Sequence, residues 1–334
     1  HCKLENLQPT GSFKLRGASN FVRCIPKADL SRGVVAFSSG NHAQAVAMAC
    51  RQMGIQATIV MPTDAPSAKV AGTRAQGAAI VVYDRFKEDR EAIGARIALE
   101  TGATLIPPYD HPWTIAGQGT AALELLQEVP DLDALVTCVG GGGLVSGCGT
   151  IAKAMRPSVR VFGVEPELAS DTFQSLQKGE RVEIPPSATI ADGLRSPKPG
   201  AITFPIMQRI LDSVLLVSEA EIKDAMRFLA MRMKIVVEPS GAVSAAAAET
   251  LVRPTESVAP NGNRLSPVSN PPSAHSQYKS SSRRTISLRM MVWSANLALP
   301  EKSISRKDRC PSVRRCRYLR RSCSVPRKRS AISR

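Results

Sequence analysis

The 334-residue sequence lacks the features of membrane, secreted and zinc-binding proteins. It contains no run of about 18 apolar residues, which excludes a membrane-spanning helix. Residues 1–13 show no basic segment followed by an apolar one, so we expect no secretory signal. None of the eight cysteines has the CxxC spacing of a zinc site. These absences predict a cytoplasmic protein with reduced thiols and no membrane partner.

The net charge of +16 is confined to the last quarter of the chain. Residues 253–334 contain 15 arginines and 4 lysines against 3 acidic residues, whereas residues 1–252 are neutral. The basic segment also has 17 serines and 8 prolines without sustained periodicity, so we expect it to be disordered. Its composition resembles translation in a shifted reading frame. Nucleic-acid binding through phosphates is the less favoured alternative.

Residues 1–250 alternate short β-branched runs with longer helical patterns. Strands are predicted at 33–39, 56–62, 79–83, 103–108, 134–140 and 159–166, and helices at 41–54, 71–78, 90–102, 117–129, 143–156, 219–234 and 240–251. This alternation is typical of α/β proteins in which helices cover open parallel sheets. Residues 33–113 hold four such strands in under a hundred residues, which indicates a compact small domain.

The first candidate for chemistry is the lysine in TGSFKLRG, residues 10–17. Ser12 can cap a helix that begins near Phe13, which places Lys14 in the first turn. The helix dipole disfavours a cation there and biases the amine toward its neutral form. Schiff-base chemistry with a carbonyl needs that neutral form. An exposed lysine on a helix face is the competing interpretation.

Two loops join a predicted strand to a predicted helix, SSGNH at residues 38–42 and the four glycines at 140–143. In a parallel sheet such loops lie at the carboxyl ends of strands, where ligands bind and helix amides attract anions. Ser39 and Asn41 add hydroxyl and amide groups, and the glycines let the backbone close around a phosphate. A simple turn with a helix cap is the alternative for the first loop.

Two familiar phosphate motifs do not fit the glycine run. A GxGxxG register that starts at Gly141 and Gly143 puts Ser146 in the third glycine position. Leu144 and Val145 follow the run, so the Walker lysine is absent. The spacing therefore argues against a dinucleotide or nucleotide-triphosphate site.

Two acidic residues after the glycine-rich helix form a candidate cation site. Glu165 and Asp171 lie six residues apart in GVEPELASDTFQS. Two carboxylates suit a hard cation such as magnesium. A pair of surface carboxylates is the default alternative.

The motifs SFKLRGA, SSGNHAQAVA, VGGGGL, GVEP and EPSGA occur in this order. Over residues 1 to about 250 the chain thus resembles the fold-type II pyridoxal-phosphate enzymes, most closely the serine/threonine dehydratases and serine racemases. His42 and Leu15 favour this group over the similar cysteine and threonine synthases. The resemblance implies a large cofactor-binding domain of residues 1–32 and 114–252 and a small domain of residues 33–113. We expect a homodimer that acts on a small amino acid.

Position by position, the resemblance implies a role for each motif. Lys14 forms the Schiff base with pyridoxal phosphate, Phe13 packs against the cofactor and Asn41 contacts its ring hydroxyl. The other residues implied to bind the cofactor are Gly140, Gly141, Gly142, Gly143, Leu144, Gly193 and Glu238. The loop implied to bind the substrate is Ser38, Ser39, Gly40, Asn41 and His42, with Ser39 facing the α-carbon. Glu165, Asp171 and the carbonyl of Ala169 match the Mg²⁺ or Ca²⁺ site of the racemase-like members.

The resemblance implies a dehydratase, or ammonia-lyase, that converts serine, threonine or 3-hydroxyaspartate to a 2-oxo acid and ammonia. A serine racemase-like isomerase is the nearest alternative, because the Ser39 hydroxyl could return a proton on the side opposite Lys14. The family's N-terminal helix and strand and its final SGGN-like strand have no counterpart in the sequence. An inactive copy with a nucleic-acid-binding tail is therefore a third alternative.

Overall fold

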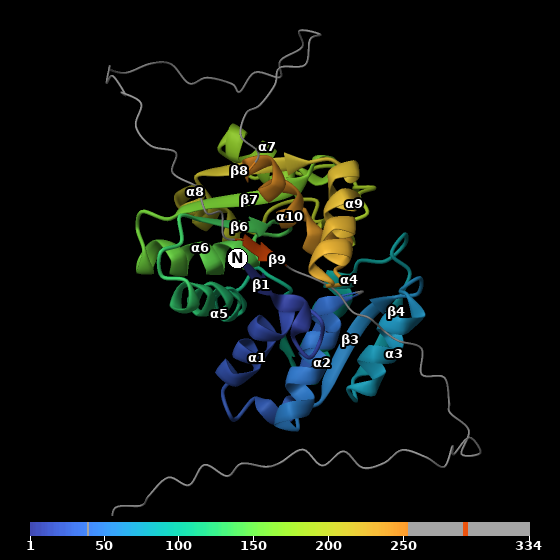
Figure 1. Cartoon of the computed structure of the whole chain (residues 1–334). Coiled ribbons are helices and arrows are strands. Elements are labelled where there is room, and N and C mark those ends of the chain that lie inside the picture. The colour runs from blue at the N-terminus through green and yellow to red at the C-terminus, as the bar shows by residue number, and fades with distance from the viewer. Residues whose placement is uncertain (39, 253–289, 293–334) are drawn as a thin grey trace, which may run out of the picture. The chain divides into compact units, whose positions relative to one another are not determined.

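The structure is a computed structural model that describes residues 1–38, 40–252 and 290–292 (Figure 1). Residues 253–334, for which disorder and a shifted reading frame are expected and nucleic-acid binding is the less favoured alternative, lie outside the described residues, apart from one short strand at 290–292. Within the described residues, two parallel sheets and their covering helices form an α/β fold, as predicted.

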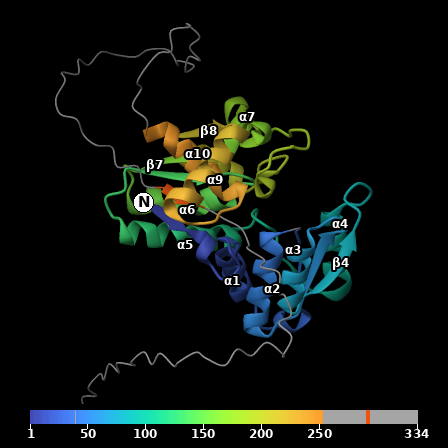
Figure 2. The same cartoon turned by 45° about the vertical axis from the view of Figure 1, so that its right-hand side comes forward.

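The first sheet has the strand order β4 (Ala79–Tyr83), β3 (Ala57–Pro62), β2 (Val34–Phe37) and β5 (Thr104–Leu105). Helix α2 (Asn41–Met53) contacts β2 and β3 on one face, and α4 (Arg90–Thr101) packs on the other face. Helix α3 (Ser67–Ala75) lies beside α2 (Figure 2). All four residues of β2 are buried, because helices cover both faces of this parallel sheet.

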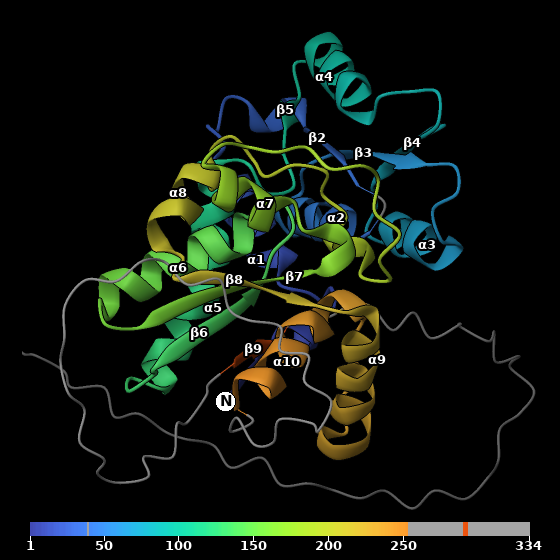
Figure 3. The same cartoon turned by 90° about the horizontal axis from the view of Figure 1, so that it is seen from above.

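The second sheet has the parallel strand order β6 (Ala134–Cys138), β7 (Arg160–Pro166) and β8 (Ser213–Val217). Helices α6 (Gly143–Met155) and α8 (Thr203–Ile210) lie on one side of it (Figure 3). Helices α9 (Glu219–Phe228) and α10 (Pro239–Val252) lie on the other side. Helix α7 (Asp171–Lys178) contacts β8.

Helix α1 (Lys14–Cys24) connects the two sheets, because it packs against both α2 and α5 (Pro112–Glu128). Helix α5 in turn packs against α6 of the second sheet. The two strands β2 and β6 therefore point their carboxyl ends toward the region where α1 begins. The proposed division into domains at residues 33 and 113 stays a prediction.

A short strand pair stands beside the second sheet. Strand β1 (Cys2–Leu4) runs parallel to β9 (Met290–Val292), with Cys2 opposite Met290 and Leu4 opposite Val292. Strand β9 also contacts β6 and α10. Sequence patterns had not indicated a strand after residue 252. Such pairing uses backbone hydrogen bonds and needs no hydrophobic periodicity.

Each predicted strand and helix is present, and the main differences lie at helix ends. Helix α5 begins at Pro112 rather than at residue 117, because His111 Nδ1 accepts a hydrogen bond from the Trp113 amide and Pro112 suits a first turn. The helix predicted over 219–234 ends at Phe228 and continues as a π-helical turn, Leu229–Met233. Patterns missed α7, α8 and β8.

Two further expectations concern thiols and membranes. Among the described residues, the cysteines at positions 2, 24, 50, 138 and 148 form no disulfide with one another, as expected of reduced thiols. In the described part of the chain, every helix is too short or too polar to cross a membrane.

Candidate active site

Lys14 is the first residue of α1, and its amine faces a cavity. Lys14 Nζ donates a hydrogen bond to the Pro108 carbonyl at 2.8 Å and lies 5.2 Å from the centre of the Phe13 ring. Burial lowers the pKa of Lys14 to about 8. The expected bias toward a neutral amine is therefore present, with burial as its main cause. The interpretation of Lys14 as an exposed lysine is wrong.

Ser12 does not cap this helix, which corrects the sequence-based expectation. No side chain caps the N-terminus of α1, and Ser12 is fully buried. Its Oγ has no hydrogen-bond partner among the residues that the structure describes. Ser12 is packed in the interior, so its hydroxyl does not occupy the capping position that the local pattern indicated.

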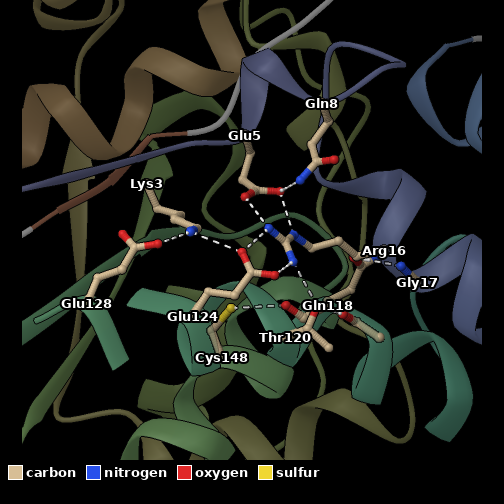
Figure 4. A network of polar contacts seen from close by, with 11 residues as sticks. Lys3, Glu5, Gln8, Arg16, Gly17, Gln118, Thr120, Glu124, Glu128 and Cys148 are labelled. Atoms are coloured by element: carbon tan, nitrogen blue, oxygen red, sulfur yellow. Dashed lines mark hydrogen bonds and ion pairs between the residues drawn. The ribbon is translucent and has the colours of Figure 1, made fainter. Parts of the chain in front are cut away.

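A chain of ion pairs fixes the start of α1 (Figure 4). Arg16 donates to both oxygens of Glu5 at 2.7 and 2.8 Å and to both oxygens of Glu124, each at 2.7 Å. Lys3 continues the chain, with Nζ 3.0 Å from Glu124 and 2.9 Å from Glu128. The contacts tie α1 to the preceding segment and to α5. They hold α1 at Arg16, two residues after Lys14.

The SSGNH loop lies at the carboxyl end of β2, as predicted. Asn41 Nδ2 donates to Glu238 Oε1 at 2.8 Å, whereas its buried Oδ1 has no hydrogen-bond partner in the described structure. His42 Nε2 donates to the Ile106 carbonyl at 3.0 Å. Burial and the nearby Lys14 charge lower the pKa of His42 to about 3, so its ring is neutral. Ser39 lies outside the described residues.

The glycine run forms a tight turn between β6 and α6. Gly142 has a φ of +90°, which glycine adopts without strain. A Cβ at Gly141 would overlap the Tyr109 ring, and one at Gly143 would lie 2.8 Å from Tyr109 Cβ. Thr203 Oγ1 donates to the Gly141 carbonyl at 2.7 Å. The loop adds no side chains of its own beside the first amides of α6, an arrangement that suits an anion.

One cavity joins these motifs. Every residue predicted to contact cofactor or substrate and described by the structure lines it: Phe13, Lys14, Ser38, Gly40, Asn41, His42, Gly140, Gly141, Gly142, Gly143, Leu144, Gly193 and Glu238. Burial raises the pKa of Glu238 to about 7, and the charge of Asp192 adds to the effect.

Sequence reasoning missed several other lining residues, among them Lys69, Arg90, Pro108, Tyr109, Gln118, Cys138 and Asp192. For three of them a signal existed. Pro108 and Tyr109 follow β5 closely, and Cys138 ends β6. Residues at the carboxyl ends of parallel strands meet at one edge of the sheet, so these positions were candidates. Lys69 and Arg90 lie on helices and carried no such signal.

These residues fit pyridoxal phosphate. A buried amine of lowered pKa can bond an aldehyde, and the glycine loop provides amides for a phosphate. The unpartnered Oδ1 of Asn41 leaves an acceptor for a ring hydroxyl. The cavity therefore offers a nucleophile for the aldehyde, backbone donors for the phosphate and an acceptor for the hydroxyl group of the cofactor.

The predicted cation ligands lie at the end of β7, outside this cavity lining. Glu165, Ala169 and Asp171 are all fully buried, so the interpretation of the acids as a surface pair is wrong. The two Glu165 oxygens accept hydrogen bonds from the amides of Thr172 and Phe173 at 3.0 and 2.9 Å.

The Asp171 carboxyl oxygens have no N–H or O–H donor among the described residues. Burial raises the pKa of both acids, and the Glu165 charge adds to the effect on Asp171. Two carboxylates and a carbonyl suit a hard cation. A larger cluster of His, Cys, Asp or Glu side chains is absent from the described ranges.

Comparison with known proteins identifies close relatives. Serine racemase of Schizosaccharomyces pombe is 50% identical over 249 residues, which cover 75% of this chain and 77% of that protein. An L-threo-3-hydroxyaspartate ammonia-lyase of a Pseudomonas species is 53% identical over 249 residues, or 75% of this chain and 78% of that enzyme.

Solved structures agree with these relatives. The crystal structure of serine racemase from Dictyostelium discoideum matches with a TM-score of 0.70 and 45% identity, over 73% of this chain and 78% of that one. The family model described as "Pyridoxal-phosphate dependent enzyme" matches residues 1–260. The resemblance inferred from the motifs is confirmed, and the chain belongs to the family of pyridoxal-phosphate-dependent enzymes.

Proposed function

We propose that the protein is an ammonia-lyase that converts a β-hydroxy amino acid to a 2-oxo acid and ammonia. The observation that carries the proposal is the buried Lys14 amine, which shares one cavity with the glycine cradle and the SSGNH loop. The names of two close relatives, both L-threo-3-hydroxyaspartate ammonia-lyases, support this choice.

The chain's residues perform three tasks in the proposed reaction. The glycine loop holds the phosphate. Neutral His42 and Asn41 line the substrate side of the cavity. Lys14 removes the α-proton, since a pKa of about 8 leaves about half of the amine neutral at pH 8. Bound pyridoxal phosphate supplies the electron sink for the negative charge that develops at the α-carbon. The β-carbon–oxygen bond then breaks, water leaves, and hydrolysis of the enamine yields ammonia.

Arg90 favours a substrate with a second carboxylate. It lines the cavity at the N-terminus of α4, with its guanidinium 5.6 Å from the centre of the Phe37 ring. Arg90 is exposed and forms no ion pair with another described residue, so its charge is available to an anion bound in the cavity. A hydrogen-bonded charge contributes roughly 1.5–3 kcal/mol. We therefore propose 3-hydroxyaspartate as the preferred substrate over serine and threonine.

The test for Lys14 combines adduct mapping with product analysis. Borohydride reduction of the cofactor-loaded protein should place the adduct on Lys14. Lys14→Ala should lose more than the ~10²- to 10⁴-fold that proton transfer alone contributes. An adduct on Lys69, the other cavity lysine, would contradict the assignment. Chiral analysis of the products separates elimination from racemisation, which the serine racemase relatives make the second candidate.

Arg90→Gln tests the substrate preference. It should lower kcat/KM for 3-hydroxyaspartate by roughly tenfold to a hundredfold and leave that for serine nearly unchanged. Arg96→Gln on the same helix is the matched control, because Arg96 is 62% exposed and pairs with Glu100. An equal loss of kcat/KM for both substrates would show that Arg90 does not bind the second carboxylate.

We also propose that Glu165, Asp171 and the carbonyl of Ala169 bind Mg²⁺ or Ca²⁺. The support is the pair of Asp171 oxygens that lack donors in a fully buried site. A divalent cation would offset the repulsion between the two carboxylates, which is otherwise costly in a buried position. The cation would stabilise the turn between β7 and α7.

A further inference from the structure

An ion pair lies at the cavity between elements of the two sheets. Lys69 Nζ on α3 is 2.9 Å from Asp192 Oδ2 in the 3₁₀ turn Asp192–Leu194, and both residues line the cavity. The side chains are 19% and 45% exposed, so the pair lies where the cavity meets solvent. The two residues are 123 positions apart in the sequence. Only the tertiary structure brings them together.

The two ends of the ion pair belong to different sheets. Helix α3 packs beside α2, which carries Asn41 and His42. Lys69 crosses over the SSGNH loop, because a Cβ at Gly40 would lie 3.2 Å from Lys69 Nζ. The turn that holds Asp192 is anchored to α10, where Ser240 Oγ accepts a hydrogen bond from the Gly193 amide at 3.0 Å. Breaking the pair would therefore remove this polar contact between α3 and the turn anchored to α10.

A second contact between the two sides lies close by. Asn41 Nδ2 donates to Glu238 Oε1 at 2.8 Å. The Asp192 charge raises the pKa of Glu238, after burial, whereas the Lys69 charge opposes that rise. Lys69 thus offsets the repulsion between two carboxylates on the opposite wall. Without the Lys69 charge, both the contact between residues 69 and 192 and the hydrogen bond from Asn41 to Glu238 weaken.

We propose that the Lys69–Asp192 ion pair is a latch that holds the cavity closed and opens when substrate and product exchange. The inference rests on the proposed function only in treating the cavity as the reaction site. Cofactor binding, which family membership establishes, gives a measurement that does not depend on the reaction. The latch acts on both cofactor retention and substrate binding.

The test is a double-mutant cycle on the cofactor-loaded protein. Lys69→Gln and Asp192→Asn should each raise the cofactor dissociation rate and the KM about twofold to fivefold, as suits a half-exposed pair. The double variant should be no worse than either single variant, because both remove the same interaction. Exchanging the two charges, Lys69→Asp with Asp192→Lys, should restore most of the retention.

Arg85→Gln is the matched control, since Arg85 and Asp64 form a 2.8 Å ion pair whose two residues both follow strands of the first sheet. It should leave both measurements unchanged. Additive effects in the double variant, or a Lys69→Gln protein indistinguishable from Arg85→Gln, would overturn the latch. So would a raised KM with unchanged cofactor dissociation, which would instead make Lys69 a substrate ligand. If neither the wild type nor any variant releases ammonia, the proposed reaction is wrong. The cofactor dissociation rates still test the latch in that case.

Discussion

Replacing Arg16 with glutamine removes the guanidinium that lies between two carboxylates at the start of α1. Arg16 makes two hydrogen bonds to Glu5, two to Glu124 and one to Thr120 Oγ1 at 3.0 Å. The Glu5 side chain is only 2% exposed, so in the variant its charge stays buried without a cation. Glu124 is 43% exposed and keeps its contact with Lys3. Most of the loss in the free energy of unfolding therefore comes from the broken ion pair between Arg16 and Glu5.

Breaking a buried ion pair by removing one partner costs ~3–5 kcal/mol. For a protein of this size, each kcal/mol shifts Tm by about 2–4 °C. Arg16→Gln should therefore lower Tm by roughly 6–20 °C at neutral pH. Arg16→Lys should fall between wild type and Arg16→Gln, because an ammonium keeps the charge but cannot bind two carboxylates bidentately.

The loss should depend on pH with a defined sign. In the wild type, hydrogen bonds from Arg16 lower the pKa of Glu124 from 4.5 to about 2. That stabilisation is present above pH 4.5 and is lost as the pH falls through about 2. In Arg16→Gln this stabilisation of Glu124 by Arg16 is absent. The deficit relative to wild type should thus be full at pH 7 and smaller at pH 3, where part of the wild-type stabilisation is already lost.

Thermal unfolding followed by circular dichroism at both pH values measures the effect. Arg96→Gln is the control, since its pair with Glu100 is exposed and should contribute no more than about 0.5 kcal/mol. An Arg16→Gln protein that melts within about 2 °C of Arg96→Gln would refute the reasoning. A deficit that grows from pH 7 to pH 3 would refute the assignment of the effect to the carboxylates paired with Arg16.

Three further predictions concern the cavity and the cation site. Gly141→Ala should weaken cofactor binding at least ~10-fold in an absorbance titration, because the new methyl overlaps Tyr109, and Tyr109→Ala should partly rescue it. His42 should show a neutral Nε2–H ring by ¹⁵N NMR from pH 8 to pH 5, since its pKa is about 3; protonation near pH 6 would contradict its burial. Mg²⁺ or Ca²⁺ should raise the Tm of wild type but not of Asp171→Asn, and an equal response in both would exclude the site.

Local sequence was sufficient for most strands and helices and for the positions of the SSGNH loop and the glycine run. A strand such as Val34–Phe37 can be recognised in the sequence, because a parallel strand covered on both faces must be apolar throughout. The SSGNH loop follows β2 and the four glycines follow β6, so chain direction puts each loop at the carboxyl edge of its own sheet, and tertiary structure brings the two edges to one cavity. The position of Lys14 in a first helical turn was equally local.

Tertiary structure decided how deeply each functional group is buried and which partners it meets. Ser12 has the right spacing for a cap, yet packing buries it. Glu165 and Asp171 look like surface acids because charge gives no sign of burial, and only the fold encloses them. The lowered pKa of Lys14 comes mainly from burial, which sums the packing of many distant segments. Lys69 meets Asp192 across 123 positions, and no local pattern encodes a contact over such a separation.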